Sequence, residues 1–392
     1  MSWAHPGRAP GAGSPGRRSI CFYTPSTEPS GMGAHMLDLV AEYVPVADVS
    51  VMFRPTEGGR RLLAEAAALG ARTVAIPSPR DPDFGTVVTG FLTSHPADVF
   101  HCHVGMGVED FDGVRLARAA GCAAVVQTQH QPFLLSHPRK RAGWHHAVEQ
   151  VDRLIAVSEA LGRTYERIGA APGRLTTVPN GVAPRTHQLG RAAARGLLGL
   201  GREQPVVLTI GRLAPFKGHR HLIDAIPQVA AQFPEVVVVL VGDGALRGAL
   251  AKHAAGLGIS DRVYFAGHRP DARLLLDAAD VFVLPSLHEG MPLVALEAME
   301  AGLPVVGTRV TGTEEVVVDG ETGALVPPGN ATALATAMAA LLRNPDRRRV
   351  SGEAGQRRYL ERFTRDRMAA ATWAVYDEAL QAGRSDPCGV QP

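Results

Sequence analysis

Short, continuously apolar runs alternate with amphipathic stretches along almost the whole chain. Apolar runs of this length, separated by helical stretches, are typical of parallel strands that are buried on both faces of a sheet. The runs fall into two series, so we predict two doubly wound α/β domains in tandem, with ligand sites at the carboxyl ends of the strands. The first series comprises 19–24, 49–53, 73–76, 98–103, 123–128 and 153–158, and the second comprises 205–210, 235–241, 263–265, 281–284 and 304–306.

The regions between and beyond these series set the expected domain boundaries. Residues 1–18 are rich in Gly, Pro and Arg and lack the apolar region of a signal peptide, so we expect a disordered tail. The stretch 356–382 has too many apolar positions to remain apart from the rest of the protein, so its end should pack back on the first domain. We therefore expect an N-terminal domain over 19–187, a C-terminal domain over 188–370 and a returning helix over 371–392, with a linker near 180–190.

Composition excludes several classes of function. The 392 residues are 45% hydrophobic and 20% charged, with a formal net charge of +2, which is typical of a globular protein and indicates no nucleic-acid partner. No apolar run approaches the ~20 residues that a membrane span needs. The four cysteines, at 21, 102, 122 and 388, have no C-x-x-C spacing, so we expect no zinc or redox motif and a reducing, cytoplasmic location.

Two carboxylates that stand eight residues apart, Glu289 and Glu297, mark the most informative segment. Glu289 follows the apolar run 281–284, and Glu297 lies in a helix predicted over Leu293 to Ala301, which Pro292 is well suited to start. The free N–H groups and partial positive charge of a helix N-terminus favour a phosphate. The segment therefore predicts a pocket for a nucleotide diphosphate that carries a polyhydroxylated group.

A second phosphate-binding element follows the apolar run 205–210. A glycine turn at Gly211 leads to Arg212, and Lys217 stands five residues further on, before a helix predicted from His219. Arg grips a phosphate with two parallel hydrogen bonds and Lys adds a point charge, so both would stabilise a diphosphate leaving group as its charge develops. Such cations in a loop often face only water. The carboxylate segment in the same domain favours the phosphate interpretation.

Two other glycine turns resemble a dinucleotide fingerprint without completing it. In V-G-D-G (241–244) the next glycine stands one residue too far along, so an NAD oxidoreductase is disfavoured. G-M-G (31–33) also lacks the third glycine. We interpret it as a loop that approaches the inter-domain cleft, with an ordinary turn as the alternative.

Taken in order, seven motifs resemble those of retaining glycosyltransferases of family 4 (the GT4 type), which have the GT-B architecture of two Rossmann-like domains around a deep cleft. The resemblance covers about residues 19 to 380 and is most specific in the second half. It implies an acceptor-binding N-terminal domain, a nucleotide-sugar-binding C-terminal domain and hexosyl transfer, with a UDP-sugar favoured as donor. The motifs are V-P-N-G-V (178–182), G-R-L-x-x-x-K-G (211–218), V-G-D-G (241–244), A-D-V-F-V-L-P-S (279–286), E-G-M-P-L-V-A-L-E-A-M (289–299), G-L-P-V-V (302–306) and D-G-E-T-G-A-L-V-P-P-G (319–329).

The resemblance also implies roles for individual residues. Arg212 and Lys217 would hold the donor diphosphate, Glu297 would bind the ribose hydroxyls, and Glu289 would bind the hydroxyls of the donor sugar. His103 would lie near the sugar 6-hydroxyl, and these residues other than Glu297 form the expected catalytic set. The implied donor-binding residues are Gly33, Gly211, Arg212, Lys217, Glu289, Gly290, Met291, Pro292, Leu293 and Glu297.

Two further histidines stand near these positions. We expect His101 to face away from His103 and into the core, because side chains alternate along a strand. His130, in T-Q-H (128–130), is another candidate for the cleft. The chain departs from the family pattern at 311–315, where a Gly-Gly pair is common, and we expect Thr313 to place added bulk near the donor site.

We expect no metal and no other cofactor, since in enzymes of this type Arg and Lys take the place of a metal at the diphosphate. The triplets Asp81-Pro82-Asp83 and Asp110-Phe111-Asp112 have the D-x-D pattern that binds manganese in other glycosyltransferases. Both stand in the N-terminal half, far in sequence from the phosphate-binding residues, and we interpret them as solvated loops. Transfer should retain the anomeric configuration, with the departing phosphate oxygen taking the acceptor proton.

The expected partners are a nucleotide sugar and a small soluble acceptor, for a monomer or homodimer. The segment S-I-C-F-Y-T-P-S-x-E-P-S-G-M-G (19–33) is similar to glycosyltransferases of aminoglycoside antibiotic pathways, which implies an aminocyclitol acceptor such as paromamine. A lipid or thiol-precursor acceptor at the membrane stays open, with 138–146 as the one basic segment that could dock there. A nucleotide-sugar epimerase of the same architecture and a catalytically silent donor-binding subunit are the rival functions.

Overall fold

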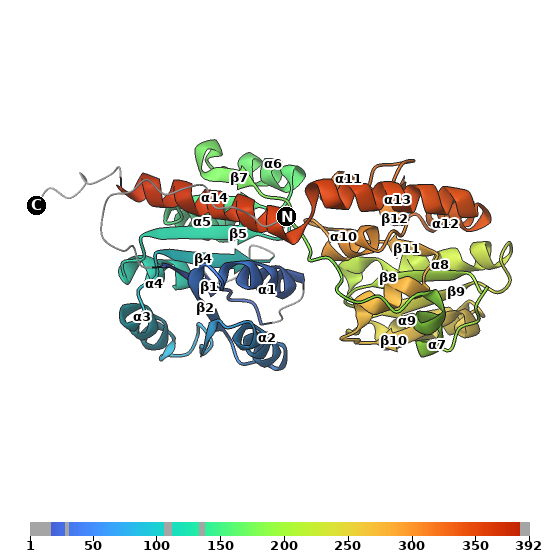
Figure 1. Ribbon diagram of the computed structural model, residues 1–392, viewed down its shortest axis with the longest axis horizontal. Coiled ribbons are helices and arrows are strands. Elements are labelled where there is room, and N and C mark those ends of the chain that lie inside the picture. Colours follow the sequence, from blue (N-terminus) through green and yellow to red (C-terminus); the bar gives the residue numbers. More distant parts are fainter. Residues whose placement is uncertain (1–16, 28–30, 106–111, 133–137, 385–392) are drawn as a thin grey trace, which may run out of the picture.

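The computed structural model describes residues 17–27, 31–105, 112–132 and 138–384, and within them the chain forms two β-sheets flanked by helices (Figure 1). The first sheet has the strand order β3-β2-β1-β4-β5-β6-β7, and the second has the order β10-β9-β8-β11-β12-β13. Neighbouring strands pair in parallel in both sheets, for example β1 with β4 and β8 with β11. Both orders follow the doubly wound pattern, so the predicted pair of Rossmann-like domains with GT-B architecture is confirmed.

The first domain holds six of its seven strands where the apolar runs predicted them. The edge strand β7 was not predicted, because it is short and only half-buried. The strands are β1 (Arg18–Tyr23), β2 (Ala47–Phe53), β3 (Arg72–Ala75), β4 (Val99–Val104), β5 (Ala124–Gln129), β6 (Arg153–Ala156) and β7 (Leu175–Thr177). The helices are α1 (Gly31–Tyr43), α2 (Glu57–Ala68), α3 (Phe84–Ser94), α4 (Asp112–Ala119), α5 (Pro138–Glu149), α6 (Glu159–Arg167) and the short η1 (Pro172–Arg174).

The second domain repeats this arrangement, and its edge strand β13 was likewise not predicted. The strands are β8 (Val206–Ile210), β9 (Val237–Val241), β10 (Val263–Gly267), β11 (Val281–Leu284), β12 (Val305–Thr308) and β13 (Gly323–Val326). The helices are α7 (Arg191–Leu197), η2 (Pro215–Lys217), α8 (His219–Ala230), α9 (Arg247–Gly256), η3 (Ser260–Arg262), η4 (Ala272–Ala278), α10 (Leu293–Glu300), α11 (Thr313–Val316), α12 (Ala331–Arg343) and α13 (Pro345–Arg362).

The last helix lies along the first domain, although α13, just before it, covers the second (Figure 1). This helix, α14 (Arg365–Arg384), begins ahead of the boundary that we expected at residue 371. Tyr376 and Ala379 of α14 are buried in the same apolar cluster as Phe22 and Val126 of the first sheet. The apolar positions that indicated a packed C-terminal helix therefore form part of the core of the first domain.

The chain passes between the domains at two points that lie side by side. The N–H of Val182 donates to the carbonyl oxygen of Phe363, and the N–H of Arg365 donates to the carbonyl oxygen of Val182, both at 3.0 Å. A parallel bridge between Val182 and Thr364 joins the same segments. The expected linker near 180–190 is thus paired, at its start, with the return to the first domain.

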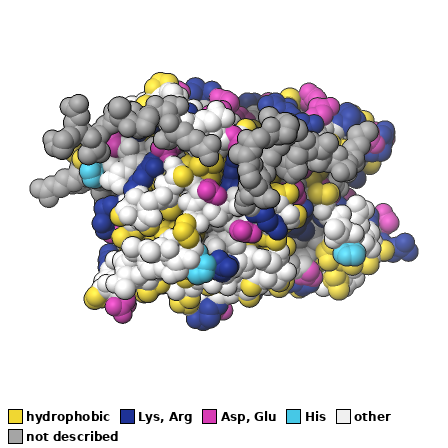
Figure 2. All heavy atoms as spheres, turned by 60° about the vertical axis from the view of Figure 1, so that its left-hand side comes forward, with side chains coloured by type: hydrophobic (Ala, Val, Ile, Leu, Met, Phe, Trp, Pro, Cys, Tyr) yellow, Lys and Arg dark blue, Asp and Glu magenta, His cyan; other side chains and the backbone are white. Residues whose placement is uncertain are grey.

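The surface carries no extended patch of one charge among the described residues visible in Figure 2, where basic and acidic side chains are interspersed. This agrees with the small net charge of the chain. Within the described ranges, no helix combines the length and apolar character needed to cross a bilayer. Cys21, Cys102 and Cys122 are buried, and position 388 lies outside the described residues.

Candidate functional site

The loop after β8 carries the two cations that were predicted to hold a phosphate. Gly218 has a left-handed backbone (φ 66°), and a Cβ there would lie 1.9 Å from the carbonyl oxygen of Pro285, so glycine is needed for this loop to pack against the loop after β11. The N–H of Leu287 donates to the carbonyl oxygen of Phe216 (2.7 Å) and joins the same two loops. This contact brings Lys217 to the carboxylate segment.

Lys217 and Glu289 form an ion pair at the base of this loop. Nζ of Lys217 lies 2.7 Å from Oε1 of Glu289, whose side chain is 3% exposed. Oγ of Ser286 donates to the same oxygen at 2.6 Å. Arg212 is exposed, and its guanidinium carbon lies 5.4 Å from the ring centre of Phe216, while Lys217 lies 5.7 Å from that centre. One cation is therefore fixed by a carboxylate and the other is open to a ligand.

The V-G-D-G turn after β9 supports the cation loop. A Cβ at Gly242 (φ 135°) would lie 2.0 Å from the carbonyl oxygen of Gly211, and one at Gly244 would lie 2.6 Å from that of Leu213. The N–H of Gly211 donates to the carbonyl oxygen of Val241 at 2.9 Å. These glycines allow close packing of two loops, which accounts for a glycine spacing that only resembles a dinucleotide fingerprint.

The first turns of two helices, one from each domain, lie next to each other. α10 begins after Pro292, as predicted, and no side chain caps it. α1 begins at Gly31, where an added Cβ would lie 3.6 Å from Cδ1 of Leu293. Gly33, which we expected to approach the cleft, is buried inside α1, so Gly31 stands at this position instead. Both helix ends present N–H groups that favour an anion between the domains.

Gly290 brings the backbones of the two domains into contact. A Cβ at Gly290 would lie 2.0 Å from the carbonyl oxygen of His130, and one at Gly312 would lie 1.8 Å from the carbonyl oxygen of Gly290. We expected Thr313 to add bulk near the donor site, but its side chain points into the core of the second domain instead. It is fully buried, and its Cγ2 packs over Gly307 of β12, where the missing side chain leaves room for it.

Glu297 lies in a group of charges that comes from both domains. Burial raises the pKa of Glu297 to about 7, against the attraction of Arg273, whose Nε lies 3.6 Å from its Oε1. The carboxylates of Asp38 and Glu300 raise this pKa further. Burial also raises the pKa of Asp38, on α1, to about 6, although Arg365 lies 3.7 Å away. The second carboxylate of the motif is therefore poised to change charge near neutral pH.

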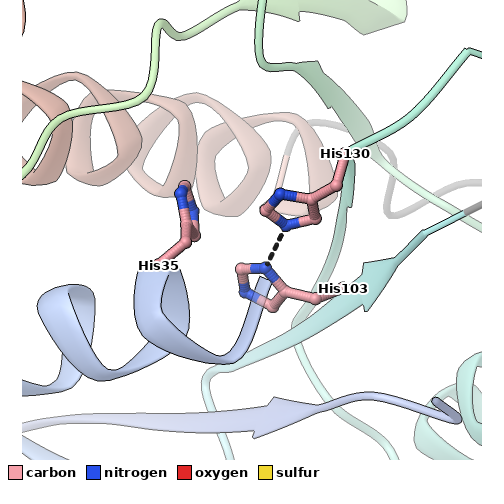
Figure 3. Close-up of side chains that lie close together, drawn as sticks. All are labelled: His35, His103 and His130. Carbon is pink, nitrogen blue, oxygen red and sulfur yellow. Dashed lines mark hydrogen bonds between the residues drawn. The ribbon is translucent and has the colours of Figure 1, made fainter. Parts of the chain in front are cut away.

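Three imidazole rings lie close together at the end of the first domain that faces the second domain, and Figure 3 shows them. His35 comes from α1, His103 from β4, and His130 directly follows β5. Nδ1 of His103 lies 3.1 Å from Nε2 of His130, and Nδ1 of His35 lies 3.0 Å from Oδ1 of Asn180. Burial lowers the pKa of His35 to about 4 and holds the pKa values of His103 and His130 well below 6.5. All three rings are therefore neutral at physiological pH.

The expectation that His101 faces away from His103 is wrong. Residues two apart on a strand share a face, and the two ring centres lie only 4.0 Å apart. His101 is nevertheless a core residue, as we expected. Its Nδ1 lies 2.6 Å from the hydroxyl of Tyr376 and its Nε2 lies 2.7 Å from Oγ1 of Thr128, so both nitrogens have partners.

The D-x-D triplets give no metal site within the described residues. Asp81 accepts a hydrogen bond from the N–H of Asp83 in an exposed turn. Of the second triplet, residues 110 and 111 lie outside the described ranges. Among the described residues, the group of side chains with metal-ligating geometry is formed by His35, His103 and His130 instead.

Several residues of this region were not singled out in the sequence. Asn180 belongs to the V-P-N-G-V motif, and its Nδ2 donates to the carbonyl oxygen of Met291 at 2.9 Å, so this motif could have indicated it. Ser286 ends the A-D-V-F-V-L-P-S motif. His35 and Arg273 gave no signal, because a single histidine or arginine on a helix has no diagnostic spacing.

Comparison with known proteins gives two family matches that together follow the two domains. The family described as Glycosyltransferase Family 4 matches residues 29–186, and the family described as Glycosyl transferases group 1 matches residues 191–358. Anabaena HepE in complex with UDP superposes with a TM-score of 0.78, at 21% identity, over 92% of this chain and 100% of that chain. This similarity shows that the two proteins share a fold.

Curated relatives include glycosyltransferases named for inositol and mannosyl acceptors or donors. The D-inositol 3-phosphate glycosyltransferase of Mycobacterium avium is 32% identical over 310 residues, which are 75% of this chain and 72% of that protein. The GDP-mannose-dependent alpha-(1-6)-phosphatidylinositol monomannoside mannosyltransferase of Mycolicibacterium smegmatis is 28% identical over 374 residues, which are 90% of this chain and 97% of that protein. The chain spans about six tenths of the length of several other curated relatives that it matches.

Proposed function

Because the chain belongs to glycosyltransferase family 4, we propose that it is a retaining hexosyltransferase, which moves a sugar from a nucleoside diphosphate to a hydroxyl of a small acceptor. The observation that carries this proposal is the pairing of Lys217 with Glu289 beside an exposed Arg212. Fixed cations at the end of β8 match the needs of a diphosphate leaving group. The uncapped start of α10 adds N–H donors on the same wall.

We assign one group of residues to each part of the nucleotide sugar, from the ribose through the diphosphate to the donor sugar. Glu297 accepts hydrogen bonds from the ribose hydroxyls, and Arg212 and Lys217 bind the diphosphate. Glu289 contacts the donor sugar, with the backbone around Gly290 and Met291, and His103 contacts it from the first domain. Oε2 of Glu289 has capacity for this contact, since each carboxylate oxygen has about two acceptor positions and Lys217 and Ser286 both bind Oε1.

We propose transfer with retention of configuration. The bond between the anomeric carbon and the β-phosphate oxygen breaks, and the bond from the acceptor oxygen forms on the same face of the sugar. The acceptor hydroxyl gives its proton to the departing phosphate oxygen. Arg212 and Lys217 stabilise the negative charge that develops on that oxygen, so this reaction needs no metal at the diphosphate. Activity that EDTA abolishes and manganese restores would contradict this part of the proposal.

A UDP-sugar is the donor that we propose. The structural neighbour that binds UDP supports this choice, and the GDP-mannose-dependent relative makes GDP the competing base. For the acceptor we propose a cyclitol, with an aminocyclitol such as paromamine as the first choice. The similarity of residues 19–33 to aminoglycoside glycosyltransferases supports it, and the relative named for D-inositol 3-phosphate also acts on a cyclitol. A lipid or thiol-precursor acceptor is the alternative.

A thermal-shift panel of UDP, GDP, TDP and ADP sugars tests the donor. Binding raises stability with the logarithm of ligand concentration over Kd, so a ligand at 100 times its Kd adds about 2.7 kcal/mol. We expect one nucleotide, UDP, to raise the melting temperature most. Incubation with the preferred donor and aminocyclitol, inositol phosphate or lipid acceptors then tests the reaction by product mass. A changed sugar without a glycoside would indicate an epimerase, and no product with any acceptor would indicate a silent subunit.

A further inference from the structure

We propose that His35, His103 and His130 form a binding site for one Zn²⁺ ion or a similar borderline transition-metal ion. The three rings reach one point from α1, β4 and the end of β5 (Figure 3). One ring nitrogen from each lies within 4.8 Å of the others. The site is separate from the diphosphate-binding residues, which come from the second domain, and it was not indicated by any spacing in the sequence.

The distance between two of the rings already suits a metal. Nδ1 of His103 and Nε2 of His130 lie 3.1 Å apart. Zinc binds imidazole nitrogen at about 2.0–2.1 Å in a tetrahedral arrangement, which places neighbouring ligand atoms roughly 3.3 Å apart. An ion can therefore replace the proton that these two nitrogens share, and neither ring needs to move far.

The third ring is held in the tautomer that a metal requires. Asn180 donates from Nδ2 to the carbonyl oxygen of Met291 (2.9 Å), which fixes its Oδ1 as the acceptor toward Nδ1 of His35 (3.0 Å). Nδ1 of His35 therefore carries the proton, and Nε2 keeps its lone pair for a ligand. This is the usual arrangement of a metal-binding histidine, whose second nitrogen donates to an oxygen that orients the ring.

The side chains present select the class of metal. The group contains three imidazoles and no carboxylate, and imidazole suits Zn²⁺, Cu²⁺, Ni²⁺ or Co²⁺, whereas Mg²⁺ and Ca²⁺ prefer oxygen ligands. Three protein ligands leave one position for water or for a hydroxyl-bearing ligand. His101 is adjacent, but both its nitrogens are occupied by Tyr376 and Thr128, so it is not a ligand.

Packing alone leaves part of this cluster unexplained. Nε2 of His103 is buried and has no hydrogen-bond partner within the described residues. A buried polar nitrogen without a partner costs stability, and a cluster that served only as core would be expected to satisfy it or to use apolar side chains. A buried polar atom that the core leaves unsatisfied needs an explanation such as a functional role or a bound ion, so packing alone does not account for the cluster.

Equilibrium dialysis of the full chain, without an affinity tag, tests the site with Zn²⁺ alone. We expect one bound equivalent, which the double variant His35→Asn/His103→Asn loses. Asn180→Ala should weaken binding roughly 10-fold to 100-fold, the usual effect of removing a residue that orients a ligand. His101→Asn is the matched control and should keep the full equivalent. No bound equivalent in the parent, or equal binding by the double variant, overturns the proposal.

A second measurement does not depend on whether the variants fold. X-ray absorption of the parent chain loaded with one equivalent of Zn²⁺ should show a first shell of nitrogen and oxygen with the multiple scattering of three imidazoles. Sulfur in the first shell, or a single imidazole, would overturn the site. Because both measurements need no sugar, their outcome is distinguishable from that of the donor panel. If the proposed function also holds, Zn²⁺ occupies a nitrogen of His103, the residue that contacts the donor sugar, and therefore inhibits transfer.

Discussion

At the scale of single residues, the charge of Glu297 between the two domains depends on pH. Its pKa is raised from 4.5 to about 7, so in this interval the folded chain holds a proton that the unfolded chain has lost. The stability that this proton contributes is present below pH 4.5 and is lost as the pH rises through 7. One pKa unit is about 1.4 kcal/mol, so the loss is on the order of 3 kcal/mol.

Glu297→Gln removes this loss, since the amide is neutral at every pH. We expect the variant and the parent to be equally stable near pH 4.5 and the variant to gain on the order of 3 kcal/mol by pH 8. The buried histidines change stability in the opposite sense, but they contribute equally to both proteins and cancel in the difference. Urea unfolding of both proteins at pH 5 and pH 8 measures this difference in the free energy of unfolding. A difference that does not grow with pH would contradict the assignment.

Gly290 tests the contact between the domains. In Gly290→Ala the new methyl would meet the carbonyl oxygen of His130 at 2.0 Å, so the domains must separate locally. A displacement of about 1 Å at reacting groups can cost roughly 100-fold in rate, and we expect a loss of this size in turnover. Gly248→Ala is the matched control, because a Cβ there meets nothing within 4 Å and should stabilise α9 slightly. Unchanged turnover in Gly290→Ala would show that the domains work further apart.

At the scale of elements, α14 is joined to the first sheet through a buried polar contact. The hydroxyl of Tyr376 lies 2.6 Å from Nδ1 of His101, and both residues are fully buried. Tyr376→Phe leaves that nitrogen without a partner, so we expect unfolding to become easier by about 1–3 kcal/mol. Glu378→Ala, on an exposed part of the same helix, should change stability by less than about 1 kcal/mol. Equal effects in chemical denaturation would contradict a specific role for Tyr376.

The elements also show what sequence reasoning can reach. Long apolar runs such as 237–241 predicted their strands, since burial on both faces leaves a strong pattern. The edge strand β7 was not predicted, because Leu175–Thr177 is only half-buried and has no continuous apolar pattern. Local motifs likewise led to Lys217 and Glu289, whereas His35 and Arg273 could not be predicted. Their neighbours come from distant segments, and only the fold brings these together.

At the scale of the whole molecule, Glu315 joins the two domains on the side of α6. Its carboxylate accepts hydrogen bonds from the N–H groups of Glu159 (2.9 Å) and Ala160 (2.7 Å), at the start of a helix in the other domain. A carboxylate at a helix N-terminus contributes about 0.5–2 kcal/mol. We expect Glu315→Ala to lower the free energy of unfolding by this amount. Because the variant lacks a contact between the domains, its radius of gyration in solution scattering should also increase. The neighbouring Glu314→Ala should do neither, since Glu314 is exposed.

The most direct test of the account is the turnover of the double variant Arg212→Ala/Lys217→Ala with the preferred nucleotide sugar. Each removed cation should cost about 100-fold to 1000-fold, so the variant should release nucleoside diphosphate at no more than about one ten-thousandth of the parent rate, while circular dichroism shows an intact fold. Because the loss of Lys217 leaves Glu289 buried without its cation, Arg212→Ala alone is measured beside it. Turnover equal to that of the parent in both variants would contradict the proposal that these cations bind the diphosphate.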